Sequence, residues 1–256
     1  MFRTVTIFAL AGLASAQLQL SQSCMNAFTG IIGNSDANAC LNPTALLPLA
    51  TSNDTSIVGP ITNWTQSVCS ASPCSNQTLS TIVSSIVNGC QAEIAGISGS
   101  SVDPTTLASQ ITPLVQQYYP TVRQIVCLSD NNNNCLVSTL TNLQAITGPL
   151  SLSNIASAVM LGNVPSIPNN ITCSDCTKAA YNILRTNVPS IVSDASGDLQ
   201  QTCGANFTDG VTPAGITDNA ADTTGSSGQG NGAMTLVSSG LGVSALTVLS
   251  AVFALL

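Results

Sequence analysis

The chain has 256 residues, of which ten are cysteine and none is histidine. Four lysines and arginines stand against eleven aspartates and glutamates, a formal net charge of −7. Without histidine, the chain cannot form a Ser-His-Asp or Cys-His catalytic centre or a histidine-ligated metal site. Four cations cannot neutralise a phosphate backbone, so the composition excludes nucleic acid as a partner.

The first 16 residues have the layout of a secretory signal peptide. Arg3 precedes an apolar run at residues 5–13, and the small residues Ala-Ser-Ala follow at 14–16. The alternative is a membrane helix, but this run is too short to cross about 30 Å of hydrocarbon at about 1.5 Å per residue. We expect cleavage after Ala16.

Apolar residues then recur with helical spacing, first in a short segment around residues 25–32. Residues 79–94 form one apolar face that includes Cys90, so we expect the disulfide of Cys90 to be buried. Asp103 followed by Pro104 is an N-cap with proline at the first helical position, which predicts a helix that runs to residue 126.

Pro113 and Pro120 interrupt that helix and predict a kink or a division into two shorter helices, with Tyr118 on the apolar face. Further helices are expected at 136–146, 152–161 and 179–191, the last ended or bent near Pro189. Strict alternation of apolar and polar residues is rare. The fold prediction is an all-α, disulfide-stapled bundle of five to eight short helices, at residues 17–209.

The apolar periodicity stops after Gly204, and residues 210–231 are predicted to be a flexible stalk rich in Gly, Ser and Thr. An uncharged apolar run at 241–256 ends the chain. Small residues, a polar spacer and a terminal apolar tail are typical of a GPI-attachment signal. The predicted attachment site is Asn231, with Ser226 and Ser227 as alternatives, and residues 232–256 would be removed.

A tail-anchored membrane helix is the competing interpretation of this end. A membrane-spanning anchor usually carries cationic residues on its cytoplasmic side, and none follows the run here. The signal peptide at the other end also argues against it. We therefore expect the protein on the outer face of the plasma membrane or in the cell wall.

All ten cysteines lie between the two expected processing sites, where thiols are oxidised. An even number there predicts five disulfides, whose pairing the spacing does not determine. The Gly/Ser-rich segment 95–101 divides the cysteines five and five, so at least one bridge must cross it if all are paired. The set is Cys24, Cys40, Cys69, Cys74, Cys90, Cys127, Cys135, Cys173, Cys176 and Cys203.

Two further patterns concern modification and metal binding. Cys173 and Cys176 form a C-x-x-C motif, which is typical of redox or zinc sites. No second ligand pair accompanies it, so we predict structural disulfides and no metal or cofactor. Five N-x-S/T sequons predict N-glycosylation at exposed positions: Asn53, Asn63, Asn76, Asn170 and Asn206.

No motif marks an active site. Glu93 is the only glutamate and is expected at a solvated helix end, and the pairs Asp36/Asp54 and Asp194/Asp198 lack any flanking signature. A calcium loop at 130–134 would have one carboxylate, so a polar loop is favoured. Trp64 and the Tyr118-Tyr119 pair are weak candidates for a sugar platform, and a pocket between apolar helices is the alternative to a filled core.

The signal peptide, cysteine-rich ectodomain, stalk and GPI signal together resemble fungal cell-surface proteins, among them a family of secreted domains of unknown function. A shorter stretch, Cys69-x4-Cys74-x15-Cys90, is similar to elicitins, small all-α sterol carriers with three disulfides. The comparable set there would be the six cysteines from Cys24 to Cys127. Hydrophobins and CFEM domains do not fit, because both use adjacent cysteines and this chain has none.

The sequence thus predicts a GPI-anchored, glycosylated surface protein with a non-enzymatic structural or interaction role. Its expected partners are the outer leaflet of the membrane and, as candidates, wall polysaccharide or an apolar small molecule. One alternative is an extracellular carrier of an apolar ligand such as a sterol. The third is a wall-modifying enzyme that works with carboxylates.

Overall fold

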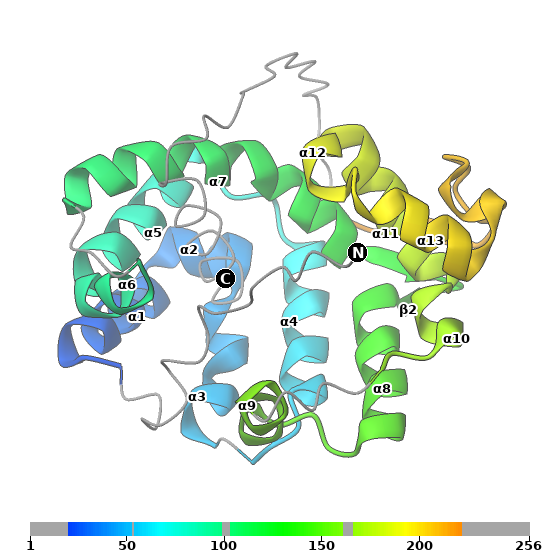
Figure 1. Cartoon of the computed structure of the whole chain (residues 1–256). Helices are drawn as coiled ribbons and strands as arrows, with labels where there is room; N and C mark the ends of the chain where they lie inside the picture. Colours follow the sequence, from blue (N-terminus) through cyan, green and yellow to red (C-terminus); the bar gives the residue numbers. More distant parts are fainter. Residues whose placement is uncertain (1–19, 53, 99–102, 161–165, 222–256) are drawn as a thin grey trace.

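The computed structural model describes residues 20–52, 54–98, 103–160 and 166–221 (Figure 1). The all-α prediction is confirmed, since this part contains thirteen α-helices, two 3-10 helices and only three short strands. None of the described helices is both long and apolar enough to cross a membrane. The predicted signal peptide, GPI-attachment sites and tail, and the sequon asparagine Asn53, lie outside the described residues.

The number of helices exceeds the predicted five to eight because several pieces are too short to show an apolar period. In chain order the elements are α1 (Gln22–Gly33), α2 (Ser35–Leu41), η1 (Pro43–Leu46), α3 (Leu47–Thr51), α4 (Val58–Ser70), α5 (Asn76–Gly89), α6 (Gln91–Ser98), α7 (Pro104–Val126), β1 (Leu128–Asp130), β2 (Asn133–Asn134), α8 (Cys135–Thr147), α9 (Leu152–Met160), α10 (Asn169–Thr172), α11 (Asp175–Asn187), α12 (Pro189–Val192), α13 (Ala195–Cys203), η2 (Ala205–Thr208) and β3 (Ile216–Asp218).

The largest apolar core lies between α1, α2, α5, α6 and α7. The α5 face predicted from the spacing is buried, with Leu79, Ile82, Val83, Ile86 and Val87 at most 4% exposed. The chain breaks helical geometry after this face, so the predicted helix over 79–94 is two helices, α5 and α6. Cys90 lies at the junction of these two helices and is buried, as expected for its disulfide with Cys24.

Helix α7 is continuous, although two prolines interrupt its backbone hydrogen bonds. Pro113 and Pro120 are both exposed and lie seven residues apart, which places them on the same side of the helix. Water can therefore solvate the carbonyls that lose their partners, and the predicted division into two helices does not occur. Asp103 is the N-cap as predicted, and accepts the backbone N–H of Thr106 at 2.8 Å.

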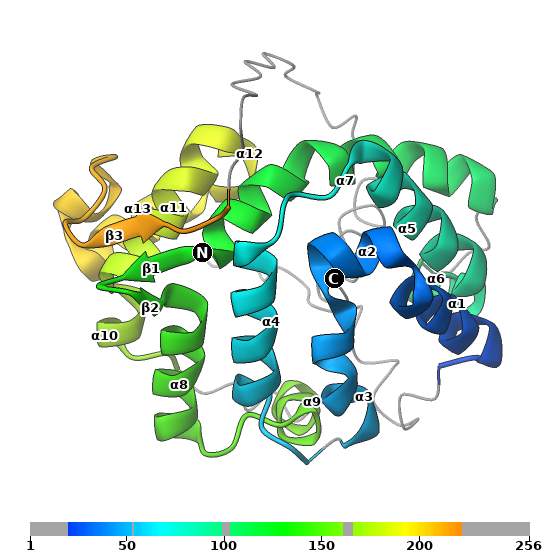
Figure 2. The same ribbon diagram turned by 180° about the vertical axis from the view of Figure 1, so that it is seen from behind.

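The buried stripe of α7 follows a four-residue spacing, with Leu107, Ile111, Val115, Tyr119 and Arg123 buried. Four residues turn an α-helix through more than one full turn, so this stripe rotates gradually around the helix. It faces α5 along most of its length and α4 and α11 near its end (Figures 1 and 2). The expectation that Tyr118 lies on the apolar face is therefore wrong, and Tyr119 takes that place.

A second group of elements follows α7, comprising α8, α10 to α13 and a small antiparallel sheet with strand order β2-β1-β3. Strand β3 pairs with β1, with Leu128 opposite Asp218. Beyond β3, the backbone N–H of Asn219 donates to Cys127 and that of Ala221 donates to Cys69. Residues 216–221, which we call the C-terminal strap, are thus part of the folded domain. The folded domain therefore extends beyond residue 210, where the sequence predicted the stalk to begin.

One close approach between helices depends on glycine. A Cβ on Gly89 would lie 2.3 Å from the Cβ of Ala27 and 3.1 Å from the carbonyl of Ser23, both in α1. Gly89→Ala is therefore expected to lower the free energy of unfolding by about 1 to 3 kcal/mol through overpacking, measured by chemical denaturation. The control is Gly30→Ala, an exposed α1 position with nothing within 4 Å, which should be neutral or stabilising.

Candidate functional site

All ten cysteines form disulfides, as predicted. The pairs are Cys24–Cys90, Cys40–Cys74, Cys69–Cys127, Cys135–Cys176 and Cys173–Cys203. The Cys69–Cys127 bridge crosses the 95–101 boundary, which confirms the parity argument. Cys173 and Cys176 pair with different partners, so the C-x-x-C motif is a structural feature.

The pairing divides the molecule into two disulfide sets. The six cysteines from Cys24 to Cys127 pair only with one another, and the four from Cys135 to Cys203 do the same. No disulfide joins the two sets. Their connection depends on the chain between Cys127 and Cys135 and on noncovalent contacts, including those of the C-terminal strap.

The sequon asparagines within the described ranges all face solvent. Asn63 on α4, Asn76 at the start of α5, Asn170 on α10 and Asn206 on η2 are exposed. By contrast Asn182, which is in no sequon, is 7% exposed and donates to the carbonyl of Val211. An oligosaccharide could therefore be attached at each of these four positions without disturbing the core.

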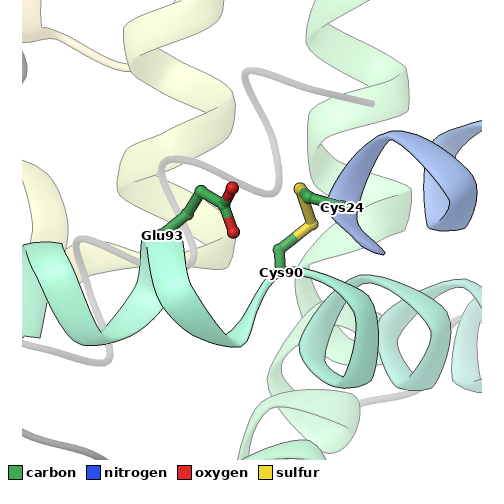
Figure 3. Close-up of side chains that lie close together, drawn as sticks. All are labelled: Cys24, Cys90 and Glu93. Carbon is green, nitrogen blue, oxygen red and sulfur yellow. A yellow bond between two sulfur atoms is a disulfide. The ribbon is translucent and has the colours of Figure 1, made fainter. Parts of the chain in front are cut away.

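The sequence predicted Glu93 to be a solvated residue at the end of a helix. In the structure it lies in the first turn of α6, beside the Cys24–Cys90 disulfide, and its carboxylate is hydrogen-bonded (Figure 3). Its carboxylate accepts the backbone N–H of Ser21 at 2.6 Å and the Ser21 hydroxyl at 3.3 Å. Ser21 is in turn the N-cap of α1 and accepts the backbone N–H of Cys24. Glu93 thus fixes the start of α1.

Partial burial acts to raise the pKa of Glu93, but hydrogen bonds from the backbone and hydroxyl of Ser21 and from its own backbone N–H outweigh this effect. The pKa therefore lies below its ordinary value of 4.5. A depressed folded-state pKa contributes stability at pH values above the unfolded-state pKa, and this contribution is lost as the pH falls through the folded-state pKa.

Glu93→Gln is accordingly expected to lower the free energy of unfolding at pH 7 by less than about 1 kcal/mol, because the group is largely solvated. The difference between variant and parent should shrink as the pH falls below 4.5. Denaturant unfolding from pH 7 to pH 2.5 measures it. A difference that stays constant across this range would contradict the assigned role of the carboxylate.

The atoms of Cys24, Cys90 and Glu93 lie within 4.8 Å of one another, close enough to hold a metal ion. The two sulfurs are bonded to each other, however, and offer no thiolate. One carboxylate remains, and it already accepts hydrogen bonds from Ser21. The residues present do not fit a metal site.

The structure does not bring either of the two candidate aspartate pairs, Asp36/Asp54 and Asp194/Asp198, together in a hollow. Asp36 lies in the first turn of α2, and Asp54 accepts the hydroxyl of Ser153 at 2.8 Å. Asp194 is the N-cap of α13, and Asp198 lies in the first turn of the same helix. None of the four lines either hollow described below.

The three aromatic residues that the sequence offered as a sugar platform, Trp64, Tyr118 and Tyr119, do not form an exposed one. Trp64 is half-buried, and its indole N–H donates to the carbonyl of Leu41 at 2.8 Å. Tyr119 is 6% exposed, and its hydroxyl accepts the backbone N–H of Cys74 at 3.0 Å. Tyr118 is half-buried on α7. These rings therefore serve packing and hydrogen bonding between helices.

Two open hollows lie within the described residues. The first, of about 230 Å³, lies between the β1–β2 hairpin, α8 and the start of α11. The second, of about 350 Å³, lies between the same hairpin, α8 and α4. Both are lined mainly by hydroxyl and amide side chains, and neither is the closed apolar cavity expected of a carrier. The predicted calcium or polar loop at 130–134 is the hairpin that separates them.

Arg123 is a buried cation that no sequence pattern indicated. Arg123 is 2% exposed, and its guanidinium donates to the carbonyl of Val68 at 2.7 Å, to that of Ala71, and to that of Ala221 at 3.4 Å. Val68 and Ala71 end α4, where the helix dipole favours a positive charge. No carboxylate within the described ranges forms an ion pair with Arg123, since the ion pair found there is Lys178–Asp209.

Comparison of the chain with protein-family models, with curated proteins and with solved structures finds no match.

Proposed function

We propose that the protein is a GPI-anchored extracellular glycoprotein of the cell surface with a non-enzymatic structural or interaction role. The observation that carries the proposal is the surface of the disulfide-stapled domain. Four sequon asparagines in four different helical elements are all exposed on it. Five disulfides suit a small helical domain that must persist outside the cell.

The test is expression of the full chain in a eukaryotic secretory host. The expected result is a mature N-terminus at Gln17, glycopeptides at the four exposed sequons, and release of the protein from intact cells by a phosphatidylinositol-specific phospholipase. Substitution of Asn231, Ser226 and Ser227 together by leucine should abolish the release. Retention in the cytosol without glycans would overturn the proposal, and a protein that stays on the membrane after the lipase would overturn the anchor.

A second candidate function is the carriage of an apolar ligand, and the disulfide pairing favours it. The six cysteines that correspond to the elicitin-like stretch form a closed three-disulfide set around the largest apolar core. A segment with the all-α, three-disulfide design of elicitins would be organised in this way.

Native mass spectrometry of the secreted, deglycosylated protein separates the two candidates. A reproducible excess mass that extracts into organic solvent as a sterol or fatty acid supports the carrier. A protein that remains ligand-free after incubation with sterols and fatty acids contradicts it and leaves the interaction role.

A further inference from the structure

The two hollows adjoin each other, because they share lining residues. Asn133 on β2 and Ser138 on α8 line both of them. Helices α4 and α8 run side by side with the hairpin at one end (Figures 1 and 2). We call these two adjoining hollows, which lie on the two sides of the hairpin between α4 and the start of α11, the polar groove.

The charge in the polar groove excludes anionic ligands. The charged side chains that line it are Asp130 and Asp175, and no cation lines either hollow. A phosphate or carboxylate would be repelled there without any compensating partner. Val137 and Ile171 supply the aliphatic surface beside the cysteines. Apolar atoms make up more of the lining surface than polar atoms do, so the groove suits an uncharged ligand that combines C–H surface with hydrogen-bonding groups.

Several groove side chains have hydrogen-bonding capacity that the protein does not use. On α8, Thr141 and Thr147 donate to the carbonyls four residues earlier. Within the described ranges Ser138 and Thr139, on the same helix, make no such side-chain bond, nor do the amides of Gln66 and Asn142. Other lining hydroxyls, those of Thr62, Thr65, Ser129 and Ser174, already bond within the protein. The hydroxyls of Ser138 and Thr139 and the amides of Gln66 and Asn142 are therefore the lining groups that remain available to a ligand.

The hairpin wall of the groove is held in place by the rest of the fold. Asn131 and Asn132 adopt the left-handed conformation, with φ of 47° and 69°. The backbone N–H of Asn131 donates to the carbonyl of Gly215 at 3.2 Å. Asn134 donates to the carbonyl of Val126 at 2.8 Å and caps α8. A wall fixed from both sides loses little conformational entropy when a ligand binds.

We infer that the polar groove binds a segment of an uncharged glycan chain, an inference that deepens the proposed interaction role and rests on it. Sugar hydroxyls both donate and accept, so one chain can satisfy the free hydroxyls, the amides and the two carboxylates. No aromatic ring lines the groove for stacking. Affinity for a short oligosaccharide is then weak, and a polymer or a surface array gains through multivalency.

The test is native affinity electrophoresis of the full chain, purified from whichever fraction of a eukaryotic host contains it, with its N-glycans trimmed. Separate gels contain soluble β-1,3-glucan, hydroxyethyl cellulose, or polygalacturonate as the anionic control. The expected result is retardation by at least one neutral polysaccharide and none by polygalacturonate. Ser138→Ala with Asn142→Ala should weaken the retardation about fivefold or more.

The matched control is Thr141→Ala with Thr147→Ala, which removes two side chains from the exposed side of the same helix and should change retardation less than about twofold. Equal loss in both double variants, or no retardation of the parent by any neutral polysaccharide, would overturn the inference. Release by phospholipase reports on the anchor alone. If the protein binds glucan but resists the lipase, the glycan-binding inference stands and the proposed anchor is wrong. If the lipase releases the protein but no polysaccharide retards it, the anchor stands and only the glycan-binding inference is wrong.

Discussion

Replacement of Cys69 and Cys127 together by alanine is expected to lower the free energy of unfolding by about 4 kcal/mol. The bridge closes a loop with a sequence separation of 58, and chain-entropy arguments give about this value for a loop of that length. It also ties the end of α4 to the end of α7, where Arg123 and the C-terminal strap meet. Guanidinium unfolding under non-reducing conditions measures the effect.

The comparison variant removes Cys135–Cys176, whose sequence separation of 41 predicts a similar entropic loss. The two variants should differ in where protection is lost. Without Cys69–Cys127, hydrogen exchange should rise in α4 and in the strap, whereas without Cys135–Cys176 it should rise in α8 and α11. A loss below about 1 kcal/mol for Cys69–Cys127 would show that the noncovalent contacts alone hold this region.

Arg123→Met is expected to cost about 3 kcal/mol, because it leaves the carbonyls of Val68 and Ala71 buried without their charged donor. Methionine has similar length and preserves most of the packing, so the loss reports on the hydrogen bonds. Arg123→Lys should fall between parent and Arg123→Met, since one ammonium group cannot reproduce the fork of the guanidinium. Thermal and denaturant unfolding provide the values.

Arg185→Met is the matched control for that variant. Arg185 is exposed, although it also donates to a backbone carbonyl, that of Thr208. Its replacement is expected to cost less than that of Arg123, about 1 kcal/mol, because an exposed guanidinium gains less from its hydrogen bond than a buried one. If both variants lose a similar free energy of unfolding, the contribution of the Arg123 hydrogen bonds does not depend on the burial of this residue.

The sequence predicted well what depends on local spacing. The apolar face of α5, the capping of α7 by Asp103 and the disulfide that crosses the 95–101 boundary all follow from neighbouring residues or from parity. The four exposed sequons agree with the expectation that glycan acceptors face solvent. These features need no knowledge of which helix packs on which.

Features that depend on distant partners were missed. Arg123 continues the four-residue row of Leu107, Ile111, Val115 and Tyr119, but the standard helical period placed the apolar face elsewhere. The row was visible in the sequence. What the sequence did not show is that α4 ends beside Arg123. In the same way β3 has three residues, too few for alternation to be recognised, and it is defined by pairing with β1, 88 residues away at Ser129–Thr217.

The polar groove falls in the same category. Ser138, Thr139 and Asn142 lie on one face of α8, and the sequence shows this spacing. Gln66 reaches the groove from α4, and Asp175 from the start of α11, far away in the chain. Polar residues on a helix indicate a solvated face by default, and only the tertiary arrangement shows that this face lines a hollow.

The position of the C-terminal strap has a mechanical consequence. Any tension transmitted through the chain beyond Ala221 first acts on the β1–β3 pairing and on the hydrogen bonds of Ala221 to Cys69 and Arg123. These bonds can open in sequence under load, because none of them is covalent. The peeling stops at Cys203, which is fixed to Cys173. A pull would thus release about 60 Å of chain and leave both disulfide sets intact, so the extension of the molecule under load has a fixed upper limit.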